Sequence, residues 1–275
     1  MTRRTLKSEL FFSGVGLHSG KKVALRLLPA QSGEGYGVLF GEDCFQLQRA
    51  RRSGDGRGTL LNFGPHRLMT VEHVLGTLRG LGIDDVTLCP EGEEVPLLDG
   101  GALPFCRAIL EAGLAETPGD PNPIAVSAPL AVLSDDEKKQ TLALPSDRLR
   151  FTYVIEYGDN AIATQMATVT PTPENFAEEL GQCRTFCLYE EVEQMRALGL
   201  GLGGTVETAL IVKGKELLTP GGLRRPDEFV RHKILDMMGD LALLGRPVIG
   251  HFIGIRAGHA MHLKLVERLF REIER

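Results

Sequence analysis

The chain lacks the features that mark membrane-spanning, disulfide-rich and nucleic-acid-binding proteins. It has no run of about 18 apolar residues, so no segment is expected to span a membrane. Its five cysteines are scattered without a Cys-x-x-Cys pair, which argues against a disulfide framework or a cysteine-rich zinc site. A net charge of −5 argues against general nucleic-acid binding, because neutralising phosphates needs a basic surface. The basic N-terminus has no apolar stretch long enough for a secretory signal, so we expect a cytoplasmic protein.

The composition is that of an ordinary globular protein. Of the 275 residues, 43% are hydrophobic and 24% are charged, which suits one large domain or two of modest size. Three prolines and a glycine fall within residues 116–123 (ETPGDPNP), a combination that neither a helix nor a central strand accommodates. We therefore predict two domains, residues 1–120 and residues 121–275.

Hydrophobic periodicity predicts an α+β fold. Val23, Leu25 and Leu27 alternate with Ala24 and Arg26, which is typical of a strand. Thr70 stands where a side chain could cap a helix. We expect helices at residues 70–79, 103–115, 176–180, 189–198, 226–244 and 260–275, and strands at residues 81–90, 124–133, 141–144, 149–157 and 247–256.

The predicted helix at residues 226–244 has two distinct faces. Pro226 suits its start, and Gly245 can cap its end. His232, Asp236 and Asp240 recur at steps of four and share one face. An apolar stripe lies apart from them, formed by Val230, Ile234, Met237, Leu241 and Leu244. Further apolar residues widen this stripe, so we expect the His/Asp/Asp face to be partly shielded from solvent.

That polar face is a candidate metal site. A histidine and an aspartate at i and i+4 can bind the same ion, but a catalytic zinc needs three protein ligands and an open position. His73 is the best third ligand, because the adjacent Glu72 offers a general base. At this level a capping or surface ion pair remains open as the alternative, and four other histidines also remain candidate ligands: His18, His66, His251 and His262.

The two halves of the sequence also show a weak internal similarity. Glu72-His73 and Arg231-His232 each belong to a predicted helix that runs through a glycine into a strand. Two similar α+β layers, each presenting one histidine, would place a shared site between them.

Ordered motifs along nearly the whole chain resemble the UDP-3-O-acyl-N-acetylglucosamine deacetylases, zinc enzymes of lipid A biosynthesis. They are RTLK at 4–7, GVGLHSG at 14–20, TVEH at 70–73, GLGID at 80–84, VPLLDG at 95–100, RTF at 184–186, GLGLGG at 199–204, DEFVRHKILD at 227–236 and GHA at 258–260. The resemblance implies hydrolysis of the N-acetyl group of an acylated UDP-glucosamine by a protein that usually works as a monomer.

The resemblance also implies residue roles. His73, His232 and Asp236 would bind Zn²⁺, although Fe²⁺ suits the same ligands. Glu72 would be the general base, His259 a cationic general acid held charged by Asp240, and Thr185 a hydrogen-bond donor to the oxyanion. Phe186 would pack on the sugar, and Lys233 would meet a phosphate or sugar oxygen.

The implied fold is two similar domains, each a sheet layered with helices, whose helix layers face each other in a β-α-α-β sandwich. An insert in the second domain would form an apolar tunnel for the acyl chain, and Val192, Met195, Gly201 and Gly204 fall in it. A flexible loop is the alternative interpretation of these glycines.

Several positions depart from the family's pattern. Residues 158–161 (GDNA) replace a usual His-Pro, Leu144 stands where a basic residue is common, Cys187 replaces a glycine, and Pro220-Gly221 alters a turn. Two other hypotheses therefore stay open: a diverged deacetylase acting on another acylated amino sugar, and a non-catalytic lipid-binding scaffold.

Overall fold

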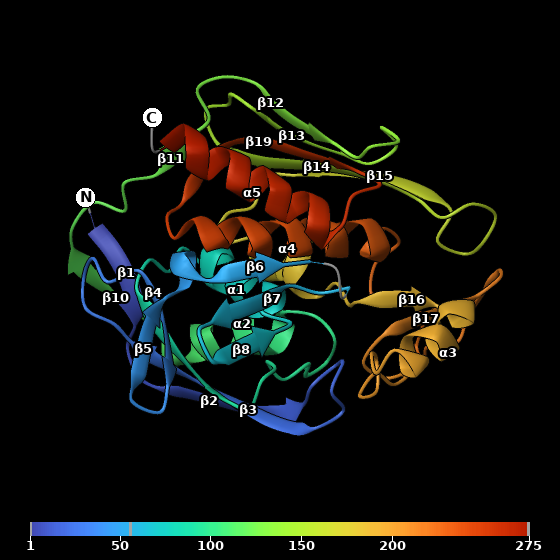
Figure 1. Ribbon diagram of the computed structural model, residues 1–275, viewed down its shortest axis with the longest axis horizontal. Helices are drawn as coiled ribbons and strands as arrows, with labels where there is room; N and C mark the ends of the chain where they lie inside the picture. The colour runs from blue at the N-terminus through green and yellow to red at the C-terminus, as the bar shows by residue number, and fades with distance from the viewer. Residues whose placement is uncertain (1, 55–56, 274–275) are drawn as a thin grey trace.

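The protein is built in four layers, in the order sheet, helices, helices, sheet (Figure 1). The computed structural model describes residues 2–54 and 57–273. Within these ranges no helix is long and apolar enough to cross a membrane. The α+β class and the facing helix layers predicted above are confirmed.

The two large sheets share one topology. The first contains, in spatial order, β2 (Leu10–Val15), β3 (Lys22–Pro29), β9 (Val86–Glu91), β4 (Tyr36–Phe40) and β5 (Asp43–Gln46). The second contains β12 (Leu130–Leu133), β13 (Gln140–Leu144), β19 (Val248–Ile255), β14 (Leu149–Glu156) and β15 (Thr164–Val169), with β11 (Ile124–Ala125) also paired to β19. In each sheet the central strand is antiparallel to one neighbour and parallel to the other. The weak similarity between the two halves of the sequence therefore corresponds to a repeated strand order. The division into domains between residues 120 and 121 stays a prediction.

Helices occupy equivalent places in the two halves. α1 (Glu72–Gly80) precedes the central strand β9, and α4 (Glu228–Leu241) precedes the central strand β19. α2 (Leu103–Ala112) and α5 (His259–Ile273) follow those strands. Each sheet is thus covered on its inner face by its own helices, and the two helix layers meet in the middle of the molecule (Figure 1).

The closest approach between the layers is the crossing of α1 and α4. A Cβ atom added at Gly239 would overlap the carbonyl oxygen of Glu72, and one added at Gly76 would lie 2.8 Å from Cδ1 of Leu235. Because glycine has no Cβ atom, the two helix backbones can come nearly into contact here. This contact brings the first turn of α1 against the middle of α4.

Smaller elements flank the four layers. They are a sheet of β1 (Thr2–Leu6) and β10 (Leu114–Pro118), a sheet of β6 (Arg51–Ser53), β7 (Leu60–Phe63) and β8 (His66–Met69), and a sheet of β16 (Phe186–Leu188), β17 (Leu210–Lys213) and β18 (Glu216–Leu217). The last of these carries α3 (Tyr189–Ala197) and projects from one side of the molecule (Figure 1). Three short helical turns complete the fold: η1 (Leu47–Arg49), η2 (Ala177–Gly181) and η3 (Ala242–Leu244).

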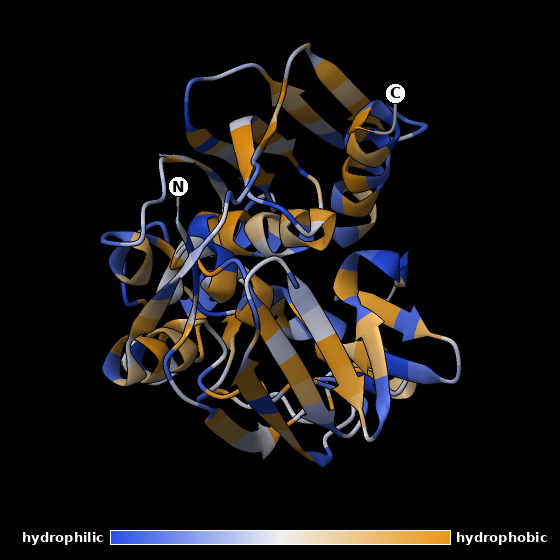
Figure 2. Ribbon diagram, turned by 90° about the vertical axis from the view of Figure 1, so that its left-hand side faces the viewer, coloured by the Kyte–Doolittle hydropathy of each residue, from blue (hydrophilic) through white to orange (hydrophobic). Residues whose placement is uncertain are grey.

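The hydrophobic core lies between the sheets and runs through the helix layers. Hydrophobic residues concentrate in the helices and strands in Figure 2. Alternate residues of β19 are buried, as the period of a strand facing one core requires. In α4 every residue is buried except Arg231 and Lys233, so its polar face is enclosed rather than solvated.

Four boundaries predicted from the sequence are wrong. Thr70 does not cap α1, because it has a φ of 57° and its hydroxyl donates to Glu94, 2.9 Å away. Residues 113–115 leave α2 because Gly113 has a φ of 81° and Leu114 begins β10. The expected strand at 124–133 divides in two, since β11 pairs with β19 and β12 pairs with β13. The helix expected from Pro226 begins only at Glu228, two residues later.

Other predicted elements agree more closely. Gly245 follows α4 and η3 with a φ of 75°, as expected of a glycine that ends a helix. The short helix expected at 176–180 is the π-helical turn η2. The C-terminal helix begins at His259, and its expected end at residue 275 lies outside the described residues.

The helix crossing generates a stability prediction. Gly239→Ala is expected to lower the free energy of unfolding by about 1–3 kcal/mol, because the added methyl group overlaps the backbone of α1. The loss should occur although alanine favours a helix over glycine by about 1 kcal/mol. Urea unfolding followed by circular dichroism measures the change. Gly76→Ala is the matched control and should cost less, because the flexible end of Leu235 can move away. A Gly239→Ala variant as stable as the parent would contradict the tight crossing.

Candidate metal centre and reaction cleft

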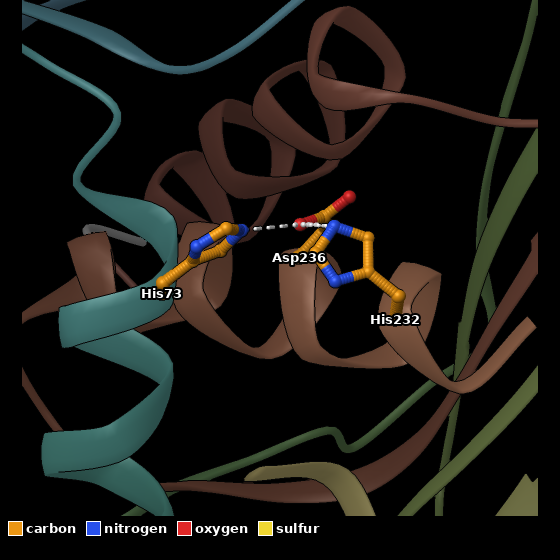
Figure 3. Close-up of side chains that lie close together, drawn as sticks. All are labelled: His73, His232 and Asp236. Carbon is orange, nitrogen blue, oxygen red and sulfur yellow. Dashed lines mark ion pairs between the residues drawn. The ribbon is translucent and has the colours of Figure 1, made fainter. Parts of the chain in front are cut away.

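Two helices bring three candidate metal ligands together. His232 and Asp236 lie one turn apart on α4, and His73 reaches them from α1 (Figure 3). One ligand atom from each residue lies within 4.8 Å of the others, and all three side chains are buried. Oδ1 of Asp236 is 3.3 Å from Nε2 of His232 and 3.7 Å from Nε2 of His73.

The protonation states of these groups suit a cation. Burial lowers the pKa of His232 to about 3, so the ring is neutral at pH 7. Burial disfavours the charged form of Asp236, but the neighbouring His232 and Lys233 hold the pKa of its carboxyl well below its usual range. Nδ1 of His232 lies 3.1 Å from the carbonyl oxygen of Cys183, which assigns the proton to Nδ1 and the lone pair to Nε2.

One buried carboxylate oxygen among these ligand atoms lacks a partner. Oδ1 of Asp236 is buried and has no hydrogen-bond partner among the described residues. A buried carboxylate oxygen without a partner costs several kcal/mol, unless a cation satisfies it. Two imidazole nitrogens and one carboxylate oxygen form a donor set that binds Zn²⁺ or Fe²⁺. The residues present therefore fit a metal ion, and the site has room for a ligand beyond these three in the adjoining cleft.

Glu72 stands beside this centre. It precedes His73 on α1 and is buried, and burial raises the pKa of its carboxyl. Its Oε2 accepts a hydrogen bond of 3.3 Å from the backbone N–H of Thr59, and its Oε1 lies 3.7 Å from Nε2 of His259. A carboxylate with a raised pKa in such a position can exchange a proton with a bound reactant.

His259 faces Glu72 and the metal ligands from the start of α5. Its Nε2 lies 3.7 Å from Oδ2 of Asp236, and its Nδ1 lies 2.8 Å from Oδ2 of Asp240. Burial works against the imidazolium, but the carboxylates of Asp240, Glu72 and Asp236 outweigh it and raise the pKa of His259 to about 9. His259 is therefore a cation at neutral pH.

A second group of candidate metal ligands is a hydrogen-bonded cluster instead. Asp240, His259 and His262 are close enough to hold an ion by distance alone. However, both Nδ1 atoms lie 2.8 Å from the same Oδ2 atom of Asp240, which is the length of a charge-assisted hydrogen bond. Such bonds leave no space for an ion between the three side chains. Among the described residues, His18, His66 and His251 belong to neither group.

The three candidate metal ligands line a cleft of about 600 Å³. Of the residues expected to act on the substrate, Thr185, Phe186 and Lys233 line it. The Lys233 ammonium group donates to Oδ2 of Asp236 over 2.8 Å and lies 5.3 Å from the centre of the Phe186 ring. Lys139 and Arg256 also line the cleft. Leu144, at the position where a basic residue is common in the family that the sequence resembles, does not line it.

A narrow cavity of about 90 Å³ adjoins the cleft. The four residues expected to form an acyl tunnel all line it: Val192, Met195, Gly201 and Gly204. Thr185, Phe186 and Cys187 line both spaces, so the two lie next to each other. The backbone N–H of Gly203 donates to the carbonyl oxygen of Leu17 over 3.0 Å, which ties this insert to the first half of the chain.

Sequence reasoning missed several residues of this region. Thr59, Lys139, Tyr153 and Arg256 received no role, and His262 was considered only as a possible metal ligand. Each of them lines the cleft or contacts its buried groups. The spacing of His259 and His262 at i and i+3 in one helix was an available signal. No such signal was present in the sequence for Thr59 and Tyr153, because the residues that they contact are distant in the chain.

The chain is similar to known proteins over nearly its whole length. A family model described as UDP-3-O-acyl N-acetylglycosamine deacetylase matches residues 3–271. A protein of Phenylobacterium zucineum is 37% identical over 275 residues, covering 98% of this chain and 93% of its own length. One of Nitratidesulfovibrio vulgaris is 39% identical over 270 residues, covering 95% and 85%. One of Anaeromyxobacter dehalogenans is 36% identical over 274 residues, covering 98% and 88%. All three are named UDP-3-O-acyl-N-acetylglucosamine deacetylase.

The charge on His259 is testable in the protein stripped of metal. His259 should titrate at about 9, because the surrounding carboxylates favour its cation. Asp240→Asn removes the carboxylate that contacts Nδ1 and should lower this pKa towards the unperturbed value of about 6.5. Histidine NMR titration measures both values, and His251, in β19, serves as the internal control. An unchanged His259 pKa in the variant would show that Asp240 does not hold the charge.

Proposed function

The chain belongs to the UDP-3-O-acyl N-acetylglycosamine deacetylase family, and from this we propose that it removes the N-acetyl group of UDP-3-O-acyl-N-acetylglucosamine in lipid A biosynthesis. Water would cleave the acetamide C–N bond, giving acetate and UDP-3-O-acyl-glucosamine. The proposal includes a cytoplasmic enzyme acting as a monomer, as the sequence resemblance implies.

We infer that the resident metal is Zn²⁺, held by His73, His232 and Asp236. The unpartnered Oδ1 of Asp236 and the neutral His232 ring support this assignment, and Fe²⁺ is the alternative that the same donors accept. A zinc ion supplies Lewis acidity, which lowers the pKa of water to about 7 and polarises a carbonyl group.

Glu72 would act as the general base. It lies beside His73 in the cleft, and its raised pKa lets its carboxylate take the proton of the attacking water as the new C–O bond forms. Oε2 of Glu72 accepts a hydrogen bond from the backbone N–H of Thr59. Oε1 is therefore left facing His259 and the reacting groups.

His259 would act as the general acid. Its Nε2 faces the cleft and carries a proton at neutral pH, so it can protonate the amine nitrogen as the C–N bond breaks. The charged ring would also stabilise the developing oxyanion, to which the hydroxyl of Thr185, another residue that lines the cleft, would donate a hydrogen bond.

The remaining cleft suits the rest of such a substrate. Lys139, Lys233 and Arg256 provide three cations for a diphosphate, and Phe186 provides an apolar surface for a sugar ring. The small cavity next to the cleft suits an acyl chain, because Val192, Met195, Gly201 and Gly204 are among the residues that line it.

The convergence around Nε2 of His259 carries the proposal. This one atom lies 3.7 Å from the candidate base Glu72 and 3.7 Å from the candidate ligand Asp236. An acid, a base and a metal site within one cleft have no use in a lipid-binding scaffold, whereas amide hydrolysis requires all three.

Acetate release from the UDP-linked substrate tests this function. The protein is expected to turn over the substrate, to lose turnover with a chelator, and to regain it when zinc is restored. Glu72→Gln should retain zinc but lose about 10²–10⁴-fold in kcat, because only the proton acceptor is removed.

Asp236→Ala is the matched control, since it should lose the metal itself. The same acylated sugar without UDP distinguishes a diverged specificity: faster turnover of the unlinked sugar would overturn the assigned substrate. Full activity of Glu72→Gln would overturn the base, and zinc content without any acetate release would favour the scaffold.

A further inference from the structure

A chain of buried hydrogen bonds runs from the second sheet to His259. The hydroxyl of Tyr153, on β14, lies 2.8 Å from Nε2 of His262, on α5. Nδ1 of His262 lies 2.8 Å from Oδ2 of Asp240, on α4. The same Oδ2 atom lies 2.8 Å from Nδ1 of His259. Three elements of the second half thus meet behind the general acid.

The chain is enclosed by protein. Tyr153, Asp240 and His262 are each 0% exposed, and His259 is 7% exposed. Polar groups buried this deeply destabilise a fold unless every one of them finds a partner. Here the Tyr153 hydroxyl, both ring nitrogens of His262, both carboxylate oxygens of Asp240 and Nδ1 of His259 have partners, which leaves Nε2 of His259 directed at the cleft.

The direction of the bonds follows from the protons available. Burial raises the pKa of Tyr153 well above its usual value, so its hydroxyl keeps its proton. Burial lowers the pKa of His262, so its ring is neutral and carries a single proton. That proton must be on Nδ1, because a bare Nδ1 would set a lone pair against the Asp240 carboxylate. Nε2 is then an acceptor, and Tyr153 donates to it.

The backbone also makes room for this tyrosine. Tyr153 pairs with Gly254 of the neighbouring strand β19, and a Cβ atom at Gly254 would overlap the tyrosine ring. The ring therefore lies across a glycine, where its orientation is fixed. Its buried neighbours on the same face of β14, Phe151 and Ile155, are apolar, so the hydroxyl is a specific feature of this position.

These contacts fix the Asp240 carboxylate in one orientation. Oδ1 accepts the hydroxyl proton of Thr59 over 2.5 Å, and Oδ2 accepts N–H groups from both His262 and His259. Rotating the carboxylate would break all three bonds. His259 must then direct Nδ1 to Asp240 and present Nε2 to Glu72 and the cleft.

We propose that Tyr153 and His262 are positioning residues for the deacetylation reaction, holding Asp240 so that it orients the general acid His259. This role rests on the proposed function and adds two residues to it. Neither residue reaches the cleft, so both act through Asp240 alone.

Kinetics of the zinc-loaded enzyme test the role. Tyr153→Phe is expected to lower kcat about 10-fold with KM within twofold of the parent, because loss of an outer partner misorients the acid without touching the substrate. Tyr36→Phe is the matched control: Tyr36 is also 0% exposed, and its hydroxyl donates to the carbonyl oxygen of Ile83 over 2.7 Å in the first half. It should leave kcat within twofold of the parent.

A pair of substitutions at the next position separates hydrogen bonding from packing. His262→Asn keeps an N–H group near the place of Nδ1, whereas His262→Leu keeps only apolar bulk. The asparagine variant should retain more kcat than the leucine variant, which should lose about 10–100-fold. Equal kcat in the two, or a Tyr153→Phe enzyme that matches Tyr36→Phe in kcat, would overturn the proposal. A rise in KM at unchanged kcat would overturn it as well.

Nitrogen-15 NMR of the histidine rings provides a readout that does not need activity. In the zinc-loaded parent, His262 should carry its proton on Nδ1, and Tyr153→Phe should shift the Nε2 resonance that loses its donor. Protonation of His262 on Nε2 would overturn the hydrogen-bond chain. Absence of deacetylase activity in the parent would instead overturn the proposed function, so the two failures are distinguishable.

Discussion

The crossing of α1 and α4 at Gly239 is the constraint on which the site depends. Because the backbone of α4 meets the carbonyl oxygen of Glu72, the first turn of α1 lies directly against the polar face of α4. His73 therefore reaches the two ligands on α4, although they are far apart in the chain. The two halves repeat one strand order, so the centre forms where their equivalent helices meet. If the two helices lay farther apart, His73 on α1 would not reach His232 and Asp236 on α4.

Burial and pairing together set the charge of each group in this centre. His232 is neutral because burial dominates, whereas His259 is a cation because three carboxylates outweigh burial. Their surroundings alone thus suit one of these two histidines, on adjacent helices, to bind a metal ion and the other to donate a proton. Hydrogen bonds through Asp240 and His262 connect His259 to Tyr153 in the second sheet.

Much of the site could be predicted from the sequence, part of it from local helix geometry and part from the family resemblance. Helical spacing predicted that His232, Asp236 and Asp240 share a face, since that depends only on local geometry. The adjacent Glu72 made His73 the best third ligand, but four other histidines stayed open until the family resemblance was considered. The role of His259 came from that resemblance alone. Features that depend on distant contacts were missed or wrong. Thr70 was expected to cap a helix but instead bonds Glu94, and the broken strand at 124–133 follows from which strands its pieces pair with.

Zinc K-edge X-ray absorption on the zinc-loaded protein would locate the metal ion directly. A centre built where α1 meets α4 predicts nitrogen and oxygen neighbours at about 2.0–2.2 Å, with outer-shell scattering from two imidazole rings. In a His73→Ala variant the scattering should correspond to one ring, because α4 supplies only His232. A sulfur neighbour at about 2.3 Å, or an unchanged imidazole contribution in His73→Ala, would place the metal elsewhere and contradict the account.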